Sequence, residues 1–196
     1  MTSISSDTIR TLAKSAGVVP YSYIGNKLYF LFQITHPPKS DTKSRNKIGV
    51  LCDFGGKRDP TDRDIVMTAS REFSEETSCL FFRKKYEHDD LKALITASTD
   101  HFSALFKNMC KEHPYFELYN DISYVVYLYK VDYIPADMFP DKEDEYMNYD
   151  VHYKRECVWI SYDDLIKLPY YKIHRRLNAV KLIPKLKCMY ENDLFL

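Results

Sequence analysis

Apolar and polar positions change period along the chain, and each change marks a predicted element. Apolar, β-branched runs at 17–24 and 28–35 predict two strands, and Gly25–Asn26 predicts the hairpin turn between them. Further strands are expected at 48–54, 79–82, 115–118, 122–133 and 153–160. A helical repeat of apolar residues predicts helices at about 61–77, 89–111, 162–167 and 175–190, the last bent or split by Pro184. Interleaved strands and helices indicate one α/β or α+β domain over residues 1–196, with a lead-in segment at 1–15.

Composition excludes several classes of protein. The 196 residues carry 28 basic and 28 acidic side chains, which argues against a globally basic nucleic-acid binder. We find neither an apolar run of about 18 residues, as a membrane span would need, nor the apolar core of a secretory signal. The five cysteines are scattered without a C-x-x-C pair. Reduced thiols in an intracellular, cytoplasmic protein that does not enter a membrane are therefore expected.

The sequence REFSEE at 71–76 carries the candidate chemistry. On a helix, Glu72, Glu75 and Glu76 share one face, within an arc of about 100°. Three like charges repel one another, so a helix tolerates them at low cost only where a cation lies among them. Carboxylate oxygens suit Mg²⁺ or Mn²⁺, which prefer hard oxygen ligands. A solvated acidic helix face is the alternative interpretation.

The stretch 56–79 resembles the Nudix box, G-x5-E-x7-R-E-U-x-E-E-x-G-U, where U is a bulky apolar residue. The second half of the box is matched in order by Arg71, Glu72, Phe73, Glu75, Glu76 and Cys79. This resemblance implies a Nudix-type α/β/α sandwich with a mixed sheet, in which the box at about 55–80 forms a loop, a helix and a second loop. The segments DFGGKRD and REFSEET resemble eukaryotic or large-DNA-virus members of the family more than compact bacterial ones.

Two departures from the box concern its loops. Ser78 stands where the family has a glycine, and counting back from Arg71 puts Arg63 at the place of the first glutamate of the box. If the box starts at Gly56, its first loop is one residue longer than usual. Asp62 or Asp64 then supplies the carboxylate that pairs with the box arginine.

The resemblance implies a Mg²⁺- or Mn²⁺-dependent hydrolase of a nucleoside diphosphate linked to another group X. Glu72, Glu75 and Glu76 would hold the metal, together with a backbone oxygen of Gly55 or Gly56. Arg71 would orient the glutamates. Similar enzymes place a general base outside the box, and Glu156, in an E-x-x-W segment ending at Trp159, is the candidate. A plain surface carboxylate is the alternative interpretation of Glu156.

Basic residues near the box are candidates for binding phosphate. Lys57 and Arg58 directly follow the paired glycines. The loop at 39–47 contains Lys43 and Arg45, and it could reach over a polyphosphate because clustered cations attract anions. A solvated loop is the alternative. Residues 174–176 are interpreted as a helix start on the surface.

The expected partner is a small-molecule nucleotide or another diphosphate. mRNA decapping at a capped RNA end and hydrolysis of diphosphoinositol polyphosphates are alternatives within the family, and the neutral charge disfavours the first. A non-catalytic Nudix-like binding or regulatory module is an alternative of another class. Such modules commonly lose box glutamates, and all three are present here. The sequence indicates neither the substrate nor the oligomeric state.

Overall fold

The strands form one mixed sheet in a computed structural model that describes residues 6–36, 49–83, 90–119, 123–139, 142–145 and 152–195. The order β5-β6-β1-β2-β8-β7 runs across the sheet, with β3 beside β2 and β4 beside β1. The pair β1–β6 is parallel and the other pairs are antiparallel. The strands are β1 (Ser15–Ile24), β2 (Lys27–His36), β3 (Val50–Cys52), β4 (Phe54–Lys57), β5 (Glu117–Tyr119), β6 (Tyr124–Lys130), β7 (Lys142–Glu145) and β8 (His152–Ser161).

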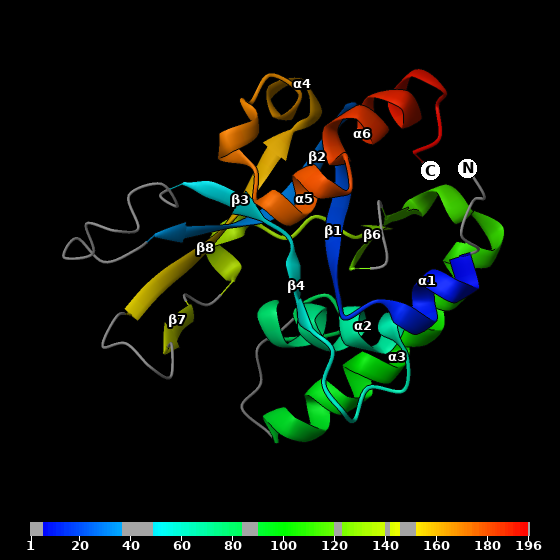
Figure 1. Cartoon of the computed structure of the whole chain (residues 1–196). Helices are drawn as coiled ribbons and strands as arrows, with labels where there is room; N and C mark the ends of the chain where they lie inside the picture. Colours follow the sequence, from blue (N-terminus) through cyan, green and yellow to red (C-terminus); the bar gives the residue numbers. More distant parts are fainter. Residues whose placement is uncertain are drawn as a thin grey trace.

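Helices cover both faces of the sheet (Figure 1). The α-helices are α1 (Ser6–Leu12), α2 (Ile65–Glu76), α3 (Leu91–Glu112), α4 (Tyr162–Leu165), α5 (Arg175–Ala179) and α6 (Leu182–Glu191). Short 3-10 turns are η2 (Pro114–Phe116), η3 (Ala136–Met138) and η4 (Tyr170–Lys172). Buried residues of α1, α2 and α3 share one core with one sheet face, and α4, α5 and α6 share a second core with the other.

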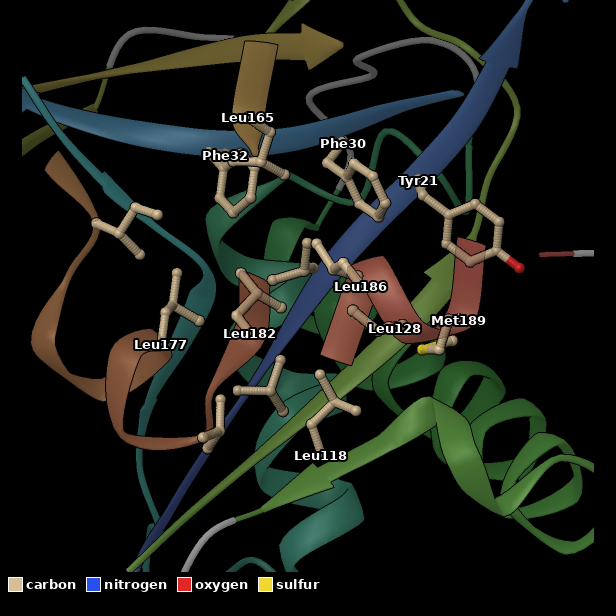
Figure 2. Packing of buried hydrophobic residues seen from close by; sticks show 14 of the residues in the cluster. Tyr21, Phe30, Phe32, Leu118, Leu128, Leu165, Leu177, Leu182, Leu186 and Met189 are labelled. Atoms are coloured by element: carbon tan, nitrogen blue, oxygen red, sulfur yellow. The ribbon is translucent and has the colours of Figure 1, made fainter. Parts of the chain in front are cut away.

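The second core shows how the C-terminal helices are held. Leu165, Leu177 and Leu186 are fully buried and belong to one cluster with the aromatic side chains of β1 and β2 (Figure 2). Full burial of a leucine contributes roughly 1.5–3 kcal/mol. This layer therefore fixes the position of α5, which matters for the site described below.

The hairpin of β1 and β2 opens away from its turn, and β3 and β4 fill the gap. The two strands pair from Ile24↔Lys27 to Tyr21↔Phe30. Beyond that point β2 pairs with β3 and β1 pairs with β4. The chain changes partner at Asp53, which belongs to neither strand. This crossing places Gly55 and Gly56 opposite Gly17 and Ala16 of β1.

Most predicted elements are present, and three predictions need correction. Residues 79–82, predicted as a strand, form turns, because Ser78 and Cys79 reverse the chain after α2. The strand predicted at 48–54 is divided at Asp53. The helical stretch 175–190 is divided as predicted, but at Lys181, whose φ is 56°, and not at Pro184.

The α/β/α sandwich with a mixed sheet is confirmed. Across the described ranges, we find no helix with the length and hydropathy needed to cross a membrane.

Candidate active site

Helix α2 presents its polar face because its apolar face is fixed in the core. The predicted stripe of Ile65, Ala69 and Phe73 is fully buried. The helix begins one residue after Asp64, whose carboxylate caps it by accepting the N–H of Met67 at 2.9 Å. The glutamates of the box therefore lie on the side that meets β4 and the loop before α2.

Arg71 is the centre of the polar face. Its guanidinium donates to Glu72 at 2.9 Å and to Glu75 at 3.0 Å from the same nitrogen, Nη1. Two further nitrogens donate to the two oxygens of Asp62, at 3.2 and 3.1 Å. Nη2 also donates to the backbone oxygen of Lys57 at 3.0 Å. Of the two carboxylates that the sequence offered as partner of the box arginine, Asp62 fills the role and Asp64 caps the helix.

The paired glycines of β4 lie directly against the other glutamates. The backbone N–H of Gly55 donates to Oε2 of Glu76 at 2.7 Å, and the side-chain amide of Gln33 donates to the same oxygen at 2.7 Å. A Cβ atom on Gly56 would overlap the carboxylate of Glu72. Glycine at this position is thus needed for the close approach of strand and carboxylate.

Negative charge is concentrated at this face. Asp62, Glu72 and Glu75 share the one guanidinium of Arg71. The side chain of Glu72 is 16% exposed, and burial raises its pKa against the opposing effect of Arg71. Burial lowers the pKa of Arg71, but the hydrogen bond with Asp62 and the charges of the three carboxylates outweigh it and raise that pKa above its ordinary value. An additional cation would offset both the repulsion among these carboxylates and the cost of burying the charge of Glu72.

The donor set fits a hard divalent cation by its chemistry. All candidate side-chain donors are carboxylate oxygens, which Mg²⁺ and Mn²⁺ prefer. Glu72 and Glu75 already converge on one cationic group, the Nη1 atom of Arg71. As they stand, no three His, Cys, Asp or Glu side chains among the described residues are close enough to surround a metal ion.

The other predicted site residues have different surroundings. Lys57 is exposed at the end of β4, and Arg58 donates to the backbone oxygens of Asp62 and Arg63, with which it closes the loop before α2. Lys43 and Arg45 lie outside the described residues.

Glu156 is not brought to the glutamates of α2. It is exposed on β8 and pairs with Ile34, which packs into the core on the α4–α6 side of the sheet. The next residue of β2, Gln33, points to the opposite face, where it contacts Glu76. Because side chains alternate between the faces of a sheet, Glu156 and Glu76 lie on opposite faces.

A cavity of about 820 Å³ opens beside Arg71 and Glu75. Its other walls come from residues 61–63 and from the first three turns of α3. Thr99 is one of the lining residues, and its buried hydroxyl makes no hydrogen bond to any part of the chain that the structure describes. The cavity is large enough to accept part of a small ligand.

The sequence did not reveal a second polar cluster beside the box, made of Asp53, Arg176 and Tyr124. Asp53 is fully buried, and Arg176 donates to its Oδ1 at 2.6 Å from α5. Residues 174–176 are thus more than a surface helix start. Gly17 was the one available signal, because an isolated glycine inside a strand suggests close approach, and a Cβ there would overlap the Asp53 carboxylate.

Two curated proteins are similar to this chain. L534, an uncharacterized protein of Acanthamoeba polyphaga mimivirus, is 34% identical over 215 aligned residues, which cover 93% of this chain and 67% of L534. The peroxisomal coenzyme A diphosphatase NUDT7 of Mus musculus is 43% identical over 63 residues, which cover 32% of this chain and 25% of NUDT7. The chain belongs to the family of L534. The match to NUDT7, a diphosphatase, agrees with the resemblance of residues 56–79 to the Nudix box.

Two crystal structures of the C. elegans Ap4A hydrolase are also similar to this chain. The binary complex is 18% identical with a TM-score of 0.45, and the match covers 91% of this chain and 98% of that one. The second structure is 16% identical with a TM-score of 0.42, and covers 94% and 99% respectively. No family model matches the chain.

Proposed function

We propose that this protein is a Mg²⁺- or Mn²⁺-dependent hydrolase of a nucleoside diphosphate linked to another group X. The observation that carries the proposal is the polar face of α2. There Arg71 gathers Asp62, Glu72 and Glu75, while Gly55 holds Glu76 against the sheet. A solvated acidic helix face would need neither a shared guanidinium nor a strand built around its carboxylates.

The residues of the chain divide the work as follows. Glu72, Glu75 and Glu76 supply oxygen ligands, with a backbone oxygen of Gly56 as the proposed fourth. Arg71 contacts the carboxylates and not the substrate, so it fixes their rotamers before the substrate binds. A divalent ion held here would neutralise the diphosphate oxygens and lower the pKa of an attacking water.

Substrate contacts are proposed for the basic residues at the rim. Lys57 is exposed beside Gly56 and is free to turn towards a phosphate. The guanidinium of Arg58 is bonded to two backbone oxygens, so a phosphate contact from it requires exchange of these bonds. Lys43 and Arg45 stay as proposals. Glu156 is not proposed as the base, because it lies on the opposite face of the sheet from Glu76. The cavity beside Glu75 is proposed to accept part of the group X.

The non-catalytic module is the second candidate of a different class. The three box glutamates disfavour it, because each has a defined contact in the site. Capped RNA and diphosphoinositol polyphosphates remain alternative substrates. A cytoplasmic location is part of the proposal and is supported by the five scattered cysteines, which include no C-x-x-C pair.

The test is a hydrolysis panel with Mg²⁺ and Mn²⁺. It holds nucleoside triphosphates, dinucleoside polyphosphates, nucleotide sugars, ADP-ribose, coenzyme A, diphosphoinositol polyphosphates and capped RNA. Glu75→Gln and Glu76→Gln are compared with Glu112→Gln, a matched change at an exposed residue that ends α3.

We expect metal-dependent cleavage of at least one compound. Both site variants should lose more than the roughly 10- to 100-fold that removal of a supporting contact costs, and Glu112→Gln should match the wild type. Metal binding without turnover on any compound would favour the non-catalytic module.

A further inference from the structure

We propose that Arg176 and Tyr124 are positioning residues for Glu76 and act on it through Asp53. The proposal rests on the proposed function only where it treats Glu76 as a metal ligand. Arg176 lies on α5, 100 residues beyond Glu76 in the sequence and in the opposite helical layer.

The first step joins α5 to the crossing between β3 and β4. Arg176 donates from Nε to Oδ1 of Asp53 at 2.6 Å and from Nη2 to the backbone oxygen of Asp53 at 3.1 Å. The hydroxyl of Tyr124 donates to the other carboxylate oxygen at 2.6 Å. The guanidinium also lies over the Tyr124 ring, 5.1 Å from its centroid. Side chain and backbone of Asp53 are thus held together from α5 and β6.

The second step joins Asp53 to Glu76. The side-chain amide of Gln33 donates to the backbone oxygen of Asp53 at 3.4 Å and to Oε2 of Glu76 at 2.7 Å. Gly55, two residues after Asp53, donates its N–H to the same oxygen of Glu76 at 2.7 Å. These two donors to Glu76 are therefore both linked to Asp53, which Arg176 contacts.

The fold leaves room for this cluster at the centre of the sheet. Gly17 and Gly55 are opposite one another in β1 and β4, and a Cβ on either would overlap a member of the cluster. Packing alone does not call for an aspartate here, because apolar residues often replace a buried ion pair without loss of stability. We therefore interpret the cluster of Asp53, Arg176 and Tyr124 as a support for the neighbouring site at Glu76.

The chain contains a second cluster of the same chemistry, which serves as an internal control. Arg10 donates to both oxygens of Glu117, at 2.9 and 2.8 Å, and the Tyr127 hydroxyl donates to one of them at 3.1 Å. Tyr124 and Tyr127 point to opposite faces of β6, so the two clusters lie in different cores. None of the contacts described for the Glu117 cluster reaches the box.

The experiment compares matched variants of the full chain. Arg176→Lys keeps the charge but cannot reproduce the two-pronged contact with the Asp53 carboxylate and backbone. Tyr124→Phe removes only one hydrogen bond. Arg10→Lys and Tyr127→Phe make the same changes in the control cluster. The two readouts are Mn²⁺ binding, followed by paramagnetic resonance with the metal alone, and hydrogen exchange of the Gly55 amide without metal.

We expect Mn²⁺ affinity to fall about 10-fold or more in Arg176→Lys, as for loss of other supports of metal ligands. It should fall less in Tyr124→Phe and stay unchanged in both control variants. Exchange of the Gly55 amide should become faster in Arg176→Lys and stay unchanged in Arg10→Lys.

Equal changes in both clusters would overturn the proposal and show a purely structural role, as would unchanged Gly55 exchange in a folded Arg176→Lys protein. Failure of the proposed function gives a different result. In that case the wild type turns over none of the substrates, while the Gly55 readout still separates Arg176→Lys from Arg10→Lys.

Discussion

The turn that follows α2 contains a residue in an unfavourable conformation, and replacing it should stabilise the protein. Ser78 has a φ of 52°, in the left-handed region, where the Nudix box has glycine. An L-residue pays roughly 1–2 kcal/mol there. Glycine offsets about 0.5–1 kcal/mol of this relief, because it makes the unfolded chain more flexible and so raises the entropy lost on folding. The net expectation for Ser78→Gly is a gain of about 0.5–1 kcal/mol in the free energy of unfolding.

Its neighbour shows why the change is confined to one residue. Cys79 also has a positive φ, of 59°, but its thiol is buried and contacts the backbone oxygen of Ser74. Cys79→Gly would relieve strain and lose packing, so no gain is expected. Ser78 is only partly buried, and its hydroxyl makes no hydrogen bond within the part of the chain that the structure describes.

Thermal and urea unfolding of the metal-free protein would measure the effect. For a chain of this length, the gain corresponds to a rise of about 1–4 °C in Tm. Ala104→Gly, at an exposed position inside α3, is the control and should lose about 1 kcal/mol. A loss in Ser78→Gly as large as that in Ala104→Gly would refute the argument from backbone strain.

Three further predictions concern stability. Asp64→Ala removes the cap of α2 and should cost about 1 kcal/mol in urea unfolding at neutral pH. Burial raises the pKa of Asp64, but hydrogen bonds from Lys107 and from a backbone N–H of α2 outweigh burial and lower that pKa below its ordinary value of 3.8. The stabilisation by Asp64 is therefore lost as the pH falls below 3.8, and the acid unfolding curves of Asp64→Ala and the wild type should converge. Arg10→Ala leaves the carboxylate of Glu117 buried and should cost about 3 kcal/mol in the same assay, whereas a loss under 1 kcal/mol would contradict the burial. Phe73→Ala empties a fully buried ring site and should cost about 3–5 kcal/mol by calorimetry, and a smaller loss would show that the core collapses around it.

Local patterns predicted the parts of the site that lie close together in the sequence. The spacing of Glu72, Glu75 and Glu76 placed them on one helix face. The shifted loop offered Asp62 or Asp64 as the partner of Arg71, and the structure decides for Asp62. Both follow from helix geometry and from short chain distances. The hairpin of β1 and β2 was predicted for the same reason, from Gly25–Asn26 between two apolar runs.

Contacts between distant segments could not be predicted in this way. Asp53 and Arg176 are 123 residues apart, and no periodicity links a strand crossing to a helix in another layer. The division of the strand at Asp53 depends on where β1 and β2 separate. The face of Glu156 depends on the register of β8 against β2, and one residue of difference would have moved it to the other side.

Metal-dependent turnover tests the central claim most directly. The wild type, Glu76→Gln and Glu112→Gln would be stripped with a chelator and assayed on the best substrate of the panel before and after Mg²⁺ is restored. We predict no turnover without metal, full recovery in the wild type and in Glu112→Gln, and at most a small fraction of it in Glu76→Gln. Equal turnover with and without metal, or full recovery in Glu76→Gln, would contradict a metal site on the polar face of α2.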